Sequence, residues 1–211
     1  MDPIYYYLIA AAVVAFIPLL RTLFCSFHTL VHEAGHAIAA LLTSGKVYKI
    51  SLFPNTEGLA YTSYRSILSG VIIYYSGYTF STLAAILSFY LIFNGELTLL
   101  YYFFILLALC SLVFWVRNFY GVFWVLFFLG SAVYMEYYQL DTLREMFILF
   151  FSSILLVQSI LSSFQIFIMS ITTPRHAGDA TGLAELTYIP AFIWGTLFFG
   201  QSLAGAYIIF Q

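Results

Sequence analysis

The segment HTLVHEAGHA, residues 28–37, combines an apolar helix pattern with four ionisable side chains. It contains the pattern H-E-x-x-H, in which His32 and His36 stand four residues apart. On a helix this spacing places both imidazoles on one face, where they can bind one tetrahedral zinc ion. Glu33 stands beside them, where a carboxylate can take a proton from a metal-bound water. Because ionisable groups in a membrane-type helix are costly and usually functional, the segment predicts a metal site.

The composition is typical of a polytopic membrane protein. Of 211 residues, 63% are hydrophobic and 8% are charged, whereas soluble domains average about 25% charged residues. We therefore expect one integral-membrane, multi-pass domain over residues 1–211 in a lipid bilayer. The net charge of -2 and the lack of a basic run argue against a nucleic-acid partner. Cys25 and Cys110 lie in separate apolar stretches and form no disulfide or metal pattern.

Apolar segments that could cross a membrane recur along the whole chain. We expect them at about residues 3–20, 28–43, 67–93, 97–116, 119–137, 145–171 and 183–210. The second carries the motif and is short and polar, as expected of a helix buried among others. The N-terminus lacks the basic region of a signal peptide, so the first span is expected to be retained. The predicted fold class is all-α, with about six to seven transmembrane helices.

Residues 46–62 differ in kind from the spans. Residues 46–52 alternate and contain β-branched side chains, as a strand does. Residues 54–58, PNTEG, favour a turn, and residues 59–62 favour a return strand. The pattern predicts a small β-hairpin at the membrane edge, directly after the metal-binding helix. The alternative is a plain surface loop.

The loop charges indicate an orientation if seven spans are assumed. Basic residues then concentrate on the N-terminal side, with five there and two opposite: Lys46, Lys49, Arg65, Arg117 and Arg175 against Arg21 and Arg144. By the positive-inside rule, the N-terminus and the hairpin are expected to face the cytosol.

A catalytic zinc usually has three protein ligands and one position for water, so a third ligand is needed. The chain offers few candidates: His28, Glu57, Glu96, Glu136, Asp141, Glu145, His176, Asp179 and Glu185. Four crossings separate the motif from Asp179, which returns it to the side of His36, whereas Glu96, Asp141 and Glu145 fall on the other side. Asp179 also opens a predicted helix, where the alternative role is that of an N-cap.

His28 lies four residues before His32 and shares its helix face. It could be a ligand, a proton shuttle or a partner of the ligands. The simplest alternative is a polar residue at the mouth of the helix.

Further short motifs accompany H-E-x-x-H. They are LTSGKV at 42–47, NTEG at 55–58, SGY at 76–78, RN at 117–118, GDATGLAE at 178–185, IP at 189–190 and WG at 194–195. Together they resemble the B-like branch of the site-2 protease family of intramembrane zinc metallopeptidases, peptidase M50. In that family the third ligand is an Asp in a Leu-Asp-Gly motif, and the matching position here is Asp179, in Gly-Asp-Ala. The Asn-x-x-Pro element of the family has no clear match, although Asn118 is a candidate.

The resemblance implies hydrolysis of a peptide bond in a transmembrane protein substrate. Zn²⁺ would be bound by His32, His36 and Asp179, and Glu33 would move the proton. The hairpin could pair with the unwound substrate as an edge strand. If so, a proline at Ile50 or Leu52 is expected to lower cleavage without loss of zinc.

Three other functions fit parts of the sequence. A protein of the same fold could be a non-proteolytic scaffold or regulator. A metal or proton transporter could use His and Asp, although transporters usually contain internal repeats and none is visible here. A different H-E-x-x-H membrane peptidase, which cuts prenylated tails, takes a Glu as its last ligand, and Glu185 would then matter.

Overall fold

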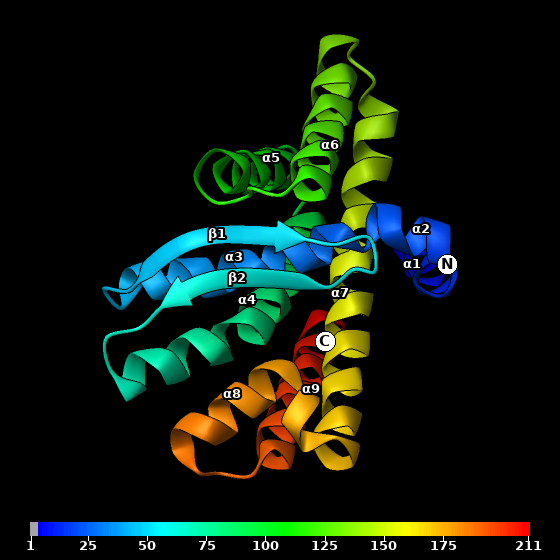
Figure 1. Cartoon of the computed structure of the whole chain (residues 1–211). Helices are drawn as coiled ribbons and strands as arrows, with labels where there is room; N and C mark the ends of the chain where they lie inside the picture. Colours follow the sequence, from blue (N-terminus) through cyan, green and yellow to red (C-terminus); the bar gives the residue numbers. More distant parts are fainter. Residues whose placement is uncertain (1–3) are drawn as a thin grey trace.

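The computed structural model describes residues 4–211, which form a largely helical molecule with one small sheet (Figure 1). The elements, in chain order, are α1 Ile4–Phe16, α2 Pro18–Phe24, α3 Ser26–Leu42, β1 Lys46–Leu52, β2 Gly58–Ser63, α4 Ile67–Phe93, α5 Leu97–Phe114, α6 Phe119–Tyr137, α7 Asp141–Thr172, the 3-10 helix η1 Pro174–His176, α8 Gly178–Thr187 and α9 Ala191–Ile209. Residues 1–3, where the first expected span begins, lie outside the described residues.

Five of the described helices, α4, α5, α6, α7 and α9, are long and apolar enough to cross a membrane. The bent pair α1 and α2 makes a sixth if it is counted as one span. Large apolar side chains on these helices face outward, among them Leu83, Leu106 and Phe123, as expected where lipid replaces water. The chain is therefore a multi-pass integral membrane protein. The helical fold with a small hairpin is confirmed. The count of five spans, or six with the bent pair, lies below or at the lower end of the expected six to seven.

The motif helix α3 differs from the expected second span. It has 17 residues, or about 26 Å of length, less than the roughly 30 Å of a bilayer core, and it is not among the candidate spans. In Figure 1 it runs across the view, whereas α5 is seen nearly end-on. Because α3 carries ionisable side chains, it needs protein on all sides, and it packs against α4, both hairpin strands and α7.

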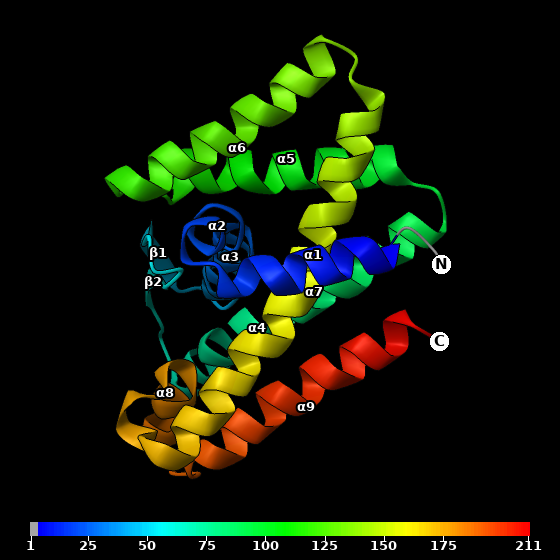
Figure 2. The same cartoon turned by 90° about the vertical axis from the view of Figure 1, so that its right-hand side faces the viewer.

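The two ends of the molecule hold different elements. The start of α1 meets the ends of α4 and α9, where Phe210 lies 6.5 Å from Tyr5 and 6.0 Å from Phe89 between ring centroids. The hairpin, the α5–α6 connection and α8 lie at the opposite end, on the left of Figure 2. The start of α1 and the hairpin thus lie at different ends of the described molecule, and the orientation expected from the loop charges stays a prediction. Four spans, α4 to α7, lie between the hairpin and α8. Because four is an even number, the chain returns to the hairpin end at α8, as expected.

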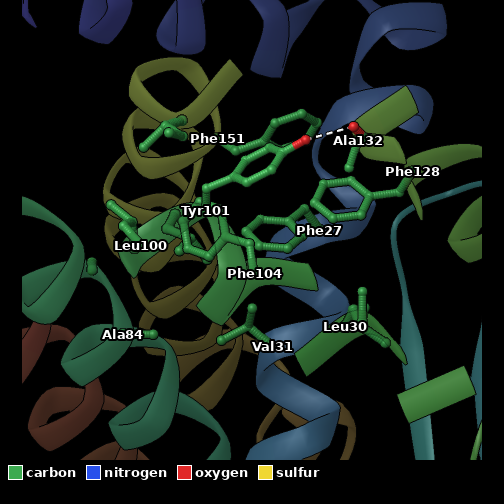
Figure 3. Close-up of a cluster of buried hydrophobic side chains, with 14 of the residues drawn as sticks. Phe27, Leu30, Val31, Ala84, Leu100, Tyr101, Phe104, Phe128, Ala132 and Phe151 are labelled. Atoms are coloured by element: carbon green, nitrogen blue, oxygen red, sulfur yellow. Dashed lines mark hydrogen bonds between the residues drawn. The ribbon is translucent and has the colours of Figure 1, made fainter. Parts of the chain in front are cut away.

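An aromatic cluster fixes the start of α3 in the core (Figure 3). The Phe27 ring lies 4.8 Å from Phe104, 4.9 Å from Phe128 and 5.2 Å from Phe151, so α5, α6 and α7 all contact it. Such aromatic pairs contribute about 0.5–1.5 kcal/mol each beyond their burial. The cluster holds the first turn of the motif helix in the core, and Phe27 lies one residue before His28.

A sharp bend separates α1 from the short helix α2, and α2 contacts the hairpin. The helices α1 and α2 are bent by 116°, with Pro18 at the first position of α2, where proline favours a helix start. The α2 side chains hold the hairpin turn, because Arg21 donates to the Thr56 hydroxyl at 3.1 Å and Thr22 donates to the Pro54 carbonyl at 2.6 Å. The turn of the hairpin is thus attached to the N-terminal helices.

Candidate metal centre

Three possible ligand atoms converge between α3 and α8. His32 Nε2 and His36 Nε2 lie 3.1 Å apart. Asp179 Oδ2 lies 3.2 Å from the first and 3.3 Å from the second. A tetrahedral zinc ion with bonds of about 2.0–2.1 Å requires ligand atoms about 3.3 Å apart. Within residues 4–211, no other group of three His, Cys, Asp or Glu side chains is arranged to hold a metal ion. The cluster is compatible with a metal site.

His36 has the tautomer that a metal ligand requires, with the proton on Nδ1 and a lone pair on Nε2. Its Nδ1 lies 2.6 Å from the carbonyl oxygen of Ile73 on α4, and only a protonated Nδ1 can donate to that acceptor. The Nε2 atom then carries a lone pair directed at the cluster. A backbone carbonyl that orients the far nitrogen of a ligand histidine is the usual arrangement around protein-bound metals.

Gly77 on α4 leaves room for the cluster. A Cβ atom at this position would lie 2.5 Å from both Nε2 atoms, closer than any real side-chain contact. The sequence contained a signal, the small residues Ser76 and Gly77 before Tyr78, but their function could not be predicted from it. The Tyr78 ring contacts His32 edge-on, at 4.6 Å between centroids, and so restricts the imidazole.

Asp179 reaches the cluster from the first turn of α8. Gly178 before it has φ +50°, a left-handed conformation that glycine adopts without strain. No side-chain cap is present at this helix start, so the alternative N-cap role of Asp179 is not observed. Burial would raise the pKa of Asp179, but the charges and hydrogen bonds of His36 and His32 hold it well below its usual range. The ionised carboxylate is the form that binds a metal.

Glu33 is 5% exposed and lies beside the ligands, facing the start of β2. A Cβ at Gly58 would lie 2.4 Å from its Oε1 atom, so the hairpin approaches the carboxylate closely only because residue 58 is glycine. Burial raises the pKa of Glu33, against the lowering effect of His32 and His36. A carboxylate with a raised pKa can accept and return a proton nearer to neutral pH.

The outer edge of β1 is occupied by the α5–α6 connection. The Ile50 N–H donates to the Trp115 carbonyl at 2.7 Å, and the Arg117 N–H donates to the Ile50 carbonyl at 3.1 Å. The amide of Asn118 binds both backbone groups of Leu52, accepting at 3.0 Å and donating at 2.6 Å. Asn118 therefore positions the hairpin and does not contact the metal cluster. A proline at Ile50 or Leu52 would test folding and not substrate pairing.

The outer edge of β2 pairs with no other strand within the described chain, and one of its residues, Ala60, hydrogen bonds through its backbone to the Glu33 carboxylate. The strands pair antiparallel with Ser51 opposite Leu59 and Ile50 opposite Ala60, and the Phe53 N–H donates to the Glu57 carbonyl. Since hydrogen-bonded and non-hydrogen-bonded pairs alternate, the backbone groups of residues 58, 60 and 62 point away from β1. These residues line the cavity that contains the cluster.

A cavity of about 860 Å³ surrounds the cluster. Its walls come from α3, the α1–α2 bend, β2, α4, α7 and the start of α8. His28 lies in it one turn before His32, at 6.3 Å between ring centroids, and is not one of the three converging residues. Gln158 and Gln165 of α7 also line it. They were not predicted as site residues, although glutamines inside an apolar span were a visible signal.

The remaining predicted candidates do not join the cluster. Glu57 and His176 line the cavity, and Glu185 is exposed on α8. Glu136 and Asp141 both pair with Arg144, at 3.0 and 2.8 Å, near the α6–α7 turn. The alternative with a last ligand at Glu185 has no geometric support, because Asp179 is the acid that meets both histidines.

A family model described as Peptidase M50B-like matches residues 4–209, nearly the whole chain. The chain belongs to the Peptidase M50B-like family. No curated protein matches it, and no solved structure does. The expected resemblance to the M50 B-like branch is confirmed, and membership of an M50 family supports a membrane metallopeptidase of the site-2 protease type.

Proposed function

We propose that this chain is an intramembrane zinc metalloendopeptidase that hydrolyses a peptide bond of a membrane-embedded protein substrate. The observation that supports it best is the convergence of His32 Nε2, His36 Nε2 and Asp179 Oδ2 at 3.1–3.3 Å from one another. Two imidazoles and one carboxylate make the donor set of a catalytic zinc site, which leaves a fourth position open. The tautomer of His36 and the space above Gly77 fit the same ion.

In this proposal His32, His36 and Asp179 bind the zinc ion, which activates water and polarises the scissile carbonyl when it is bound. Glu33 takes the proton from the attacking water and delivers it to the leaving amine nitrogen. The burial of Glu33 supports this role, because it raises the pKa of the carboxyl and so strengthens the carboxylate as a base for the first step. The enclosing helices limit the water at the site to what the cavity admits.

The substrate is expected to bind as an extended segment. A transmembrane helix satisfies its amides internally, so it has to unwind before its carbonyl can be attacked. The backbone groups of Gly58, Ala60 and Thr62 point away from β1, and all three residues line the cavity. The Ala60 backbone hydrogen bonds to Glu33, so the groups of Gly58 and Thr62 are the ones that can pair with an extended peptide. Gly58 lies against Glu33, so a segment paired with β2 would lie beside the catalytic base.

Metal analysis of the purified protein tests the proposal. We expect about one zinc per wild-type chain, and loss of zinc in His36→Ala and Asp179→Ala. Glu33→Gln should keep the metal and lose hydrolysis of fluorescently labelled casein, an unfolded protein that needs no unwinding, by about a hundredfold or more. Glu185→Ala is the matched control and should behave as the wild type.

Several outcomes would contradict parts of this proposal. A wild-type protein that contains no zinc would contradict the zinc peptidase function. If the Glu33→Gln variant kept its zinc and still cleaved casein at the wild-type rate, Glu33 would not be the base. Zinc flux into sealed vesicles would instead favour the transporter, and a cellular phenotype that survives Glu33→Gln would favour the scaffold.

A further inference from the structure

The cavity has a polar wall that the proposed reaction does not use. His28 of α3 and Gln158 of α7 both line it, and they are only 5% and 8% exposed. Nε2 of His28 is buried without a hydrogen-bond partner among residues 4–211. Nε2 of Gln158 donates to the Cys25 sulfur at 3.1 Å, a weak acceptor. Buried polar groups are almost always partnered, so His28 Nε2 has a free hydrogen-bonding position that a molecule in the cavity could fill, and Gln158 has only a weak partner.

The position of this pair relates it to the metal centre. His28 lies one helical turn before His32, and the Gln158 contact with Cys25 ties α7 to the start of the same helix. The pair therefore extends the line of His36 and His32 toward the α1–α2 bend. The outer edge of β2 lines the same cavity. A segment that pairs with β2 beside Glu33 would pass this wall.

The chemistry of the pair suits a peptide backbone. A neutral imidazole and a carboxamide each offer a donor and an acceptor, as a peptide group does. The molecule contains an internal example, because the Asn118 amide binds both the N–H and the C=O of Leu52 on the outer edge of β1. The pair does not resemble a second metal site, since the group able to hold an ion is limited to His32, His36 and Asp179 in the described chain.

We propose that His28 and Gln158 hydrogen bond to the backbone of the substrate segment beside the scissile bond and position that segment in the cavity. The inference rests on the proposed function and names residues that recognise the peptide. Because the contacts are to backbone, they select an unwound segment and not a particular side chain. Neither residue moves the proton in this scheme, so both act on binding more than on the chemical step.

Four variants test the inference: His28→Phe, His28→Gln, Gln158→Leu and Gln158→Asn. Zinc content is measured first, and then KM and kcat for labelled casein. We expect His28→Phe and Gln158→Leu to keep zinc and to raise KM about three- to tenfold, the loss of one hydrogen bond, with a smaller change in kcat. His28→Gln keeps a donor near the position of Nε2 and should recover most of the affinity, as Gln158→Asn should in part.

Binding without turnover gives a second readout. In the Glu33→Gln background, fluorescence anisotropy of a labelled casein peptide should show the same three- to tenfold weakening for His28→Phe. If His28→Phe does not fold, Gln158→Leu carries the same test from another helix. Unchanged KM and unchanged anisotropy in a zinc-bearing variant would overturn the inference while the wild type still cleaves. A zinc-bearing wild type that neither binds nor cuts casein would instead contradict the proposed function and, with it, this inference.

Discussion

The two edges of the hairpin differ in what they contact. On β1, Ile50 and Leu52 are 0% and 1% exposed, and their outward backbone groups are bound by residues 115–118. On β2, the outward groups of residues 58, 60 and 62 pair with no other strand in the described chain, and the Ala60 backbone hydrogen bonds to the Glu33 carboxylate beside the cavity of the candidate metal centre. An exposed strand edge invites unwanted pairing, and proteins usually cover it. One edge therefore attaches the hairpin to the α5–α6 connection, and the other is the edge at which we propose that the substrate binds.

The side chains follow the same division. β1 contributes apolar side chains to the core beside the α5–α6 connection. β2 begins with Gly58, against which Glu33 and Thr29 pack. Thr29 also donates to the Thr56 carbonyl at 2.8 Å, so α3 holds the turn that leads into β2. The start of β2 is thus held against Glu33, the proposed base. Substitutions on each strand should therefore have different consequences.

The largest effect is expected from Gly58→Ala. The added Cβ would lie within 2.4–2.7 Å of Glu33 and Thr29, so either the base or the strand has to move. We expect cleavage of labelled casein to fall about a hundredfold, near the contribution of a general base, while zinc content stays at the wild-type level. Gly200→Ala, in helix α9 where a Cβ would meet no atom within 4 Å, provides a glycine control for activity. Normal cleavage by Gly58→Ala would show that the close approach of residue 58 to Glu33 is not needed for activity.

A smaller effect is expected from Thr62→Pro. Proline removes the N–H of residue 62 from the outer edge of β2, where no ladder bond of the hairpin depends on it, and edge strands tolerate such a proline. Loss of one hydrogen bond to the substrate should raise KM for casein about three- to tenfold, with zinc and thermal stability retained. Thr62→Ala is the control, because it removes the side chain and keeps the N–H. Equal KM values in the two variants would show that the substrate does not pair there.

The sequence predicted the spans well where polar turns interrupt long apolar runs. The bounds expected for α4 and α6 match the structure, because Asn94 with Gly95 and Asn118 mark their limits. The spacing of His32 and His36 predicted one helix face, and an even number of crossings predicted that Asp179 returns to it. These features depend on local pattern or on counting, and a single sequence carries both.

The unpredicted features depend on packing between distant segments. The sequence of α3 does not show that it lies across the bundle, because a buried helix and a span share the same apolar pattern. Pro18 is a visible signal for the 116° bend after α1, but the apolar pattern continues across it and predicts a single span. The role of Gly77 depends on where α4 crosses α3, and the contact of Asn118 with Leu52 joins residues 66 positions apart. Neither could be derived without the structure.

The smallest effect on catalysis is expected from Asn118→Leu, although it breaks the closed edge of β1. The substitution leaves the N–H and C=O of Leu52 without partners, which should lower the free energy of unfolding by about 1–3 kcal/mol. Thermal unfolding in detergent measures the loss, and Asn94→Leu is the matched control, an exposed asparagine whose side chain bonds only to Tyr90 one turn away. Assayed well below the unfolding temperature, folded Asn118→Leu should cleave casein within about twofold of the wild type, because the β2 edge keeps its position over Glu33 through Thr29 and the α2 contacts. A variant of full stability with tenfold lower cleavage would reverse the assignment and make the β1 edge the one that serves the substrate.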